Sequence, residues 1–184
     1  MTNPEPFEES GMTFGPFPPG CAFRIEKSCL YQAMSGDGSG VKVAEMLLLR
    51  GSSEDRTPAI WIIEAKQSFP RPTSRADFEK NVERIRCKLA DSLSLFFAMR
   101  LGRHADALAE LPDQFQAVDP GAVDIKLVLI VKGHREKWLP PLNDMLNKAL
   151  RPLVRVWGLK PTAVTVTNDD GALRHGLISA VGVT

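Results

Sequence analysis

The chain has 184 residues, of which 43% are hydrophobic and 24% charged, and its net charge at pH 7 is +1. This length fits one globular domain with a sizeable core. No apolar run reaches the roughly 18 residues that a membrane span needs, so we expect a cytoplasmic protein without a membrane partner. The near-neutral charge excludes nucleic-acid binding through overall positive charge. The three cysteines, at positions 21, 29 and 87, lack metal-type spacing, which argues against a zinc site or a disulfide framework.

The first 20 residues differ in composition from the rest of the chain. They are rich in proline and glycine, and they carry three acidic residues and no basic one. A segment with so few aliphatic side chains cannot build a core. We therefore predict a flexible, Pro-rich N-terminal arm over residues 1–20 and a single α/β domain over residues 21–184. Residues 23–32 are apolar-periodic, and the pattern leaves helix and strand equally open.

Two apolar stretches, residues 41–50 and 59–66, flank a polar loop and predict an antiparallel pair of strands. A long helix is predicted from about Thr73 to Gly102. Its apolar residues recur at spacings of three and four, namely Phe78, Val82, Ile85, Leu89, Leu93 and Phe96. Residues 122–131 are a nearly continuous Val/Ile/Leu run, which is typical of a strand covered on both faces.

The C-terminal third predicts one further helix and a hairpin. Residues 136–150 have a helical pattern, and Pro152 should limit its extension. Residues 162–167 and 173–181 could pair as a hairpin around the turn at 168–171. Together these elements predict an α/β fold with a central mixed β-sheet and helices on both faces.

Charged residues stand where the two apolar stretches predict strand ends. Glu64 and Lys66 follow the run Ile60–Ile63, and a strand places them on the same face, two residues apart. Glu45 lies in the other apolar stretch. An ion taken out of water is costly unless it is paired or binds a metal. Two carboxylates and a lysine on adjacent strands therefore suggest a divalent-metal site with a lysine beside it.

This arrangement resembles the PD-(D/E)XK nuclease superfamily. The resemblance covers about residues 23–132: an acidic residue, a hairpin turn, Glu-x-Lys at a strand end, a long helix and a further apolar strand. Ala44 stands where the motif has proline, and Glu45 replaces its aspartate. The resemblance implies a restriction-endonuclease-like fold.

Phosphodiester hydrolysis needs an activated water and neutralisation of charge on the phosphate, which a hard divalent cation supplies. Glu45, Glu64 and the main-chain carbonyl of Ala65 would bind Mg²⁺ or Mn²⁺, and Lys66 would hold the attacking water. Glu26 would complete or hydrogen-bond the metal shell. Gln67 and Ser68 follow the motif and could touch the substrate backbone.

Nucleic-acid contacts are predicted along the long helix. Lys80, Arg84 and Lys88 form a row at spacings of four that could follow a phosphate backbone. The same row is equally typical of a solvated helix face.

The sequence thus predicts a metal-dependent nuclease, with DNA favoured as substrate, serving defence or repair. It leaves two alternatives open. One is a catalytically inactive nuclease-like module for nucleic-acid binding or protein assembly. The other is a plain interaction protein in which Glu64 and Lys66 form an ion pair. At this size a homodimer or a larger complex could be needed to engage the target.

Overall fold

The computed structural model describes residues 5–36, 38, 40–51 and 57–179. Its main sheet has five strands in the order β3-β4-β5-β6-β7. They are β3 (Ala22–Phe23), β4 (Met46–Arg50), β5 (Ala59–Lys66), β6 (Asp124–Val131) and β7 (Val164–Asn168). The β3–β4 and β4–β5 pairs are antiparallel, whereas β5–β6 and β6–β7 are parallel. The mixed sheet and the antiparallel pair around the loop at 51–58 are therefore as predicted.

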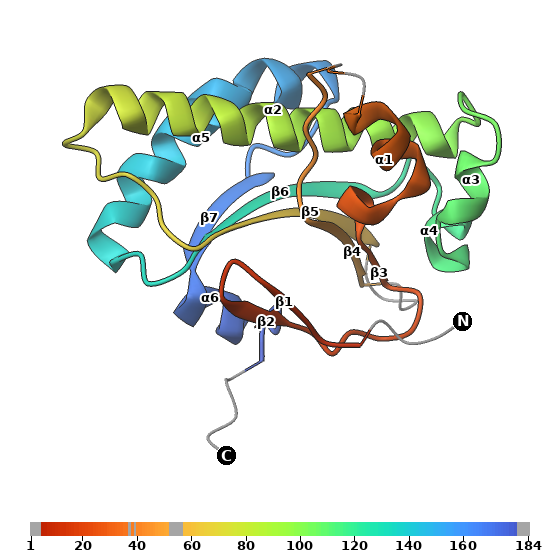
Figure 1. Cartoon of the computed structure of the whole chain (residues 1–184), viewed down its shortest axis with the longest axis horizontal. Coiled ribbons are helices and arrows are strands. Elements are labelled where there is room, and N and C mark those ends of the chain that lie inside the picture. The colour runs from red at the N-terminus through yellow and green to blue at the C-terminus, as the bar shows by residue number, and fades with distance from the viewer. Residues whose placement is uncertain (1–4, 37, 39, 52–56, 180–184) are drawn as a thin grey trace.

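Two long helices make the parallel connections. Helix α2 (Arg75–Arg100) joins β5 to β6, and helix α5 (Leu139–Val156) joins β6 to β7. Both helices lie on the same face of the sheet (Figure 1). When each new parallel strand is added on the same side of the sheet, crossover connections of the same handedness place their helices on the same face.

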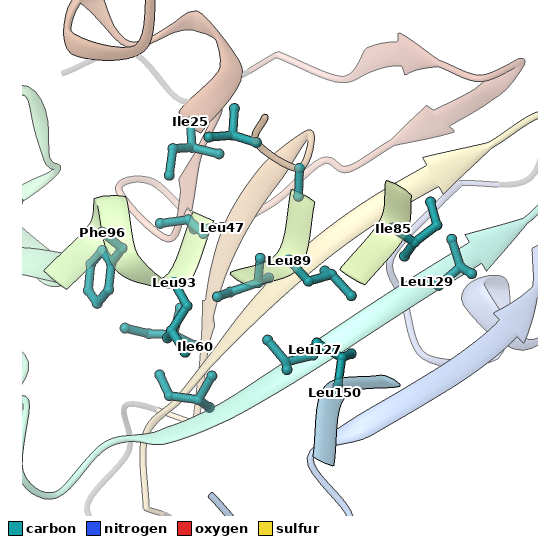
Figure 2. Close-up of a cluster of buried hydrophobic side chains, with 14 of the residues drawn as sticks. Ile25, Leu47, Ile60, Ile85, Leu89, Leu93, Phe96, Leu127, Leu129 and Leu150 are labelled. Atoms are coloured by element: carbon teal, nitrogen blue, oxygen red, sulfur yellow. The ribbon is translucent and has the colours of Figure 1, made fainter. Parts of the chain in front are cut away.

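The larger part of the core lies between these helices and the sheet. Alternation along β5 and β6 turns Ile60, Ile62, Leu127 and Leu129 toward α2. The apolar stripe of α2 meets them, and its Ile85, Leu89 and Leu93 are 0–1% exposed. Figure 2 shows Ile85, Leu89 and Leu93 packed with Ile60, Leu127 and Leu129. The predicted long helix and its buried face are confirmed.

The opposite face of the sheet is covered differently from the prediction. A hairpin of β1 (Phe7–Glu9) and β2 (Met12–Phe14) lies there together with one short helix, α6 (Asp169–Arg174) (Figure 1). Met12, Phe14 and Phe17 are buried in a second apolar cluster. Residues 7–17 therefore pack on the sheet, whereas the sequence predicts a flexible arm there. Aromatic residues and a methionine supply the burial that aliphatic residues do not.

The N-terminal region and the acidic loop contain further short elements. Residues 23–32, whose type the pattern leaves open, contain the end of β3, a 3₁₀ turn η1 (Ile25–Lys27) and most of helix α1 (Cys29–Ser35). Helices α3 (Ala107–Glu110) and α4 (Asp113–Ala117) interrupt the loop before β6. No helix in the described residues is long and apolar enough to cross a membrane.

Two predictions for the C-terminal third are wrong. Residues 169–174 form α6 instead of a hairpin turn, because the Asn168 side chain accepts a hydrogen bond from the Gly171 amide at 3.0 Å and caps the helix. Helix α5 follows the 3₁₀ turn η2 (Glu136–Trp138) and continues through Pro152 to Val156. Leu146 and Leu150 of α5 are buried, and their packing stabilises the helix by more than it loses through the hydrogen bond that Pro152 cannot donate.

Candidate active site

Strand register brings three of the predicted site residues, Glu45, Glu64 and Lys66, to one end of the sheet. Glu64 shares the α2 face of β5 with Ile60 and Ile62, and Lys66 follows two residues later on that face. The antiparallel register pairs Met46 with Ile63, so Glu45, one residue before β4, lies beside Glu64. Glu45, Glu64 and Lys66 therefore face α2 together, as the sequence predicts.

Glu64 is the most deeply buried of these residues, with no exposed surface. The Lys66 ammonium lies 2.7 Å from its Oε1 atom, and the Lys88 ammonium lies 2.9 Å from Oε1 and 3.1 Å from Oε2. Lys88 donates a hydrogen bond to Oε2, but Oε1 is ion-paired without a hydrogen bond of good geometry. One buried carboxylate oxygen is thus incompletely satisfied.

Lys88 enters the site from α2 and bridges the two strand carboxylates. Its ammonium also donates to Glu45 Oε1 at 3.3 Å. Burial lowers the pKa of Lys88, but the charges of Glu64 and Glu45 outweigh burial, and the net pKa is raised. The predicted basic row is therefore split. Lys80 and Arg84 are exposed, whereas the Lys88 side chain is 25% exposed and held by carboxylates.

Glu45 holds a proton more tightly than an ordinary glutamate. It is 6% exposed, and burial raises its pKa to about 8. The negative charge of Glu64 is the next cause, and Lys88 offsets part of the shift. A hydrogen bond with Glu26 and the charge of Glu9 raise the pKa further.

Two more carboxylates lie beside Glu45. Glu26, in η1, is ion-paired with Arg24, whose Nη2 atom also lies 3.8 Å from Glu9 Oε2. One oxygen each of Glu9, Glu26 and Glu45 lie within 4.8 Å of one another. Glu26, which the sequence predicts to complete or hydrogen-bond the metal shell, thus lies next to Glu45. Glu9 comes from the N-terminal hairpin and is not among the predicted residues.

The tip of that hairpin contacts the end of β5. The Ser10 hydroxyl donates to the Ala65 carbonyl at 3.1 Å, and the Ser10 amide donates to Glu9 Oε1 at 3.0 Å. If the β4–β5 register continued for two more residues, Ala44 would lie opposite Ala65. Instead, the Ala44 amide donates a hydrogen bond to the Ser92 hydroxyl in α2. Because β4 does not pair with Ala65, the Ser10 hydroxyl is free to bind the Ala65 carbonyl, which the sequence predicts to bind metal.

The carboxylate spacing is compatible with a cation. Oxygens that bind one divalent cation at about 2.0–2.6 Å lie within about 5 Å of each other, which the group of Glu9, Glu26 and Glu45 satisfies. The incompletely satisfied Oε1 atom of Glu64 is a further available donor. Lys88 now holds both Glu45 and Glu64, so a cation shared by these two would have to displace its ammonium.

The remaining predicted residues lie at the rim. Gln67 and Ser68 are exposed in the loop after β5. Lys88, predicted only as a nucleic-acid contact, also belongs to this site, and its position left a detectable signal: it precedes buried Ser92 by four positions, beside the apolar stripe of α2. Glu9 and Ser10 left none, because Ser10 meets Ala65 across 55 residues.

Comparison with known proteins yields no relative. No protein-family model matches the chain, no curated protein is significantly similar to it, and no solved structure matches its fold.

Proposed function

We propose that the protein is a metal-dependent nuclease of the restriction-endonuclease-like class, which hydrolyses phosphodiester bonds in nucleic acid, with DNA favoured. The observation that carries the proposal is the shared face of Glu45, Glu64 and Lys66 at one end of the sheet. A wholly buried carboxylate and its neighbours are costly to the fold, and such costs gather at functional sites.

Carboxylate and carbonyl oxygens are the donors that a hard divalent cation such as Mg²⁺ or Mn²⁺ prefers. Glu45 and Glu64 would hold it, with Glu26 and the Ala65 carbonyl as further oxygen donors. When bound, the cation would polarise the phosphate and lower the pKa of a water molecule. The Oε1 atom of Glu64 is ion-paired with Lys66 and Lys88 but has no hydrogen bond of good geometry, which leaves it able to bind a cation.

The two lysines have different environments, which suggests different roles. The Lys66 side chain is 33% exposed and lies where solvent or a phosphate can approach, so it would orient the attacking water or balance phosphate charge. Lys88 is less exposed and contacts both strand carboxylates. In the absence of a cation it would act as a positioning residue that holds Glu45 and Glu64 in place.

Cleavage assays test the proposal directly. Duplex DNA, single-stranded DNA and RNA are incubated with the protein in Mg²⁺, in Mn²⁺ and in EDTA. We expect metal-dependent cleavage that Glu64→Gln and Lys66→Ala abolish, while the exposed Glu8→Gln leaves it unchanged. Activity that persists in Glu64→Gln, or cleavage in EDTA, would contradict the mechanism.

A second candidate function is an inactive nuclease-like module that binds nucleic acid or assembles with protein. The observation that favours it is the position of Lys88, whose ammonium contacts both Glu45 and Glu64 and occupies the place between them without a metal. Calorimetry distinguishes the two functions. A nuclease should bind Mn²⁺ with loss of affinity in Glu64→Gln, whereas the inactive module should bind no divalent cation.

A further inference from the structure

Two loops meet beside the candidate active site. The β5–α2 loop covers residues 67–74, and the β6–α5 loop covers residues 132–138. Lys66 pairs with Val131 in the sheet, and the Lys132 amide donates to the Lys66 carbonyl at 2.9 Å. Both loops therefore begin at the end of the sheet where Glu64 and Lys66 lie.

These loops concentrate positive charge in a nearly neutral protein. Residues 67–74 contain one basic residue and no acidic one, and residues 132–138 contain three basic residues and one acidic one. Their sum is +3 with His134 neutral, against +1 for the whole chain. Charge of this sign beside the proposed site is complementary to a polyanion.

Two arginines from different loops converge on one aromatic ring. The guanidinium carbons of Arg71 and Arg135 each lie 5.1 Å from the centre of the Trp138 ring, so they are at most about 10 Å apart. Both arginines are exposed, and neither makes an ion pair with a carboxylate of the described residues. Their charges remain available to a ligand.

The ring itself is firmly supported. Trp138 is half-buried, and its ring centre lies 5.3 Å from that of His134. His134 is 5% exposed and also contacts the buried Phe69, at 6.4 Å between ring centres. The Trp138 ring is thus supported by His134 and lies under two guanidinium groups that no carboxylate of the described residues pairs. An aromatic ring together with such cations has the composition of a single-strand binding surface, where bases stack and phosphates meet positive charge.

We propose that Arg71, Trp138 and Arg135 bind one strand of nucleic acid. The guanidiniums contact phosphates, and an unpaired base packs against the exposed part of the Trp138 ring. The inference rests on the proposed function for its substrate class, but binding itself requires neither a metal nor catalysis. A duplex is the less suitable ligand because its bases are already stacked.

Fluorescence anisotropy with labelled oligothymidine in EDTA tests the surface. The double variant Arg71→Gln/Arg135→Gln should reduce the slope of log affinity against log salt by about 0.7 for each phosphate that the protein no longer neutralises. Trp138→Ala should weaken binding about 5- to 150-fold, the range for loss of one stacked base. Trp138→Phe should retain most of the affinity, and its thermal unfolding should show an intact fold.

The far end of α5 offers a matched control. Trp157 is 39% exposed and Arg155 is exposed, and the helix between them and Trp138 is about 27 Å long. The control variant Arg155→Gln/Trp157→Ala should bind oligothymidine as the unmodified protein does.

Several outcomes would overturn the inference. These are no binding of oligothymidine by the unmodified protein in EDTA, equal losses in the control variant, or tighter duplex binding that Trp138→Ala leaves unchanged. Binding that requires Arg71, Trp138 and Arg135 without any cleavage in Mg²⁺ or Mn²⁺ would support this surface while contradicting the nuclease proposal.

Discussion

Lys88 reaches from the middle of α2 to Glu64 at the end of β5, where its ammonium lies 2.9 Å from Oε1 and 3.1 Å from Oε2. The carboxylate is wholly buried, so this contact and the one with Lys66 supply its charge compensation. Because α2 also packs its apolar stripe on the sheet, the core and the candidate site depend on the same helix position. A shift of α2 would leave the Glu64 charge poorly paired.

Replacing Lys88 by methionine should destabilise the protein. Methionine keeps much of the side-chain volume but leaves Glu45 and Glu64 facing each other without the bridging ammonium. Loss of one partner from a buried ion pair costs about 3–5 kcal/mol. We expect a value near the lower end, about 3 kcal/mol, because Lys66 still pairs with Glu64. Urea unfolding measures the change.

Lys80→Met provides the control for this change, since Lys80 is exposed on the same helix. Its free energy of unfolding should stay within about 0.5 kcal/mol of the unmodified protein. If the carboxylates bind a cation, Mn²⁺ should raise the melting temperature of Lys88→Met more than that of the unmodified protein. Equal stabilities of the two methionine variants would refute the bridging role of Lys88.

The N-terminal hairpin should contribute strongly to stability. Phe14 is 1% exposed in the second apolar cluster and stacks on Phe7 at 5.5 Å between ring centres. Phe14→Ala should therefore reduce the free energy of unfolding by about 3–5 kcal/mol. Thermal or urea denaturation tests this, with the exposed Glu8→Ala as control. A loss below about 1 kcal/mol would instead support the flexible arm that the sequence predicts.

Periodic patterns explain which elements could be predicted from the sequence. The stripe of α2 and the apolar run of β6 each bury a complete face, so their type follows from local spacing. Glu64 and Lys66 were predictable as a pair because strand alternation fixes their shared face. Glu45 joined them through the register of one short antiparallel pair.

Contacts between distant segments explain what local patterns could not reveal. Helical spacing shows that Lys80 and Lys88 share a row, but only the tilt of α2 on the sheet decides which lysine reaches Glu64. The pairing of Ser10 with Ala65 depends on a hairpin that packs on the far side of the sheet. Residues 168–171 suit a turn as well as a helix cap, and tertiary packing decides between them.

Pro152 should be a site of stabilisation. It lies inside α5 on an exposed position, where proline removes a helical hydrogen bond at a cost of about 3 kcal/mol. Pro152→Ala restores that bond to the Lys148 carbonyl but frees the unfolded chain, which offsets about 0.4–1 kcal/mol. We expect a net gain of about 2 kcal/mol in the free energy of unfolding. Unchanged or lower stability in urea would show that α5 is kinked to accommodate the ring.

Glu45 should make stability depend on pH. Its folded-state pKa is raised to about 8, so between about pH 4.5 and pH 8 the native protein keeps a proton that the unfolded chain releases, and the Glu45 contribution to stability falls as pH rises. Glu45→Gln removes this penalty. Its free energy of unfolding relative to the unmodified protein should therefore increase with pH, by up to about 1.4 kcal/mol per pH unit, and level off above pH 8. Urea unfolding across this range, with the exposed Glu8→Gln as control, measures the difference. A flat difference, or one that falls with pH, would mean that Glu45 is ionised in the native protein at neutral pH.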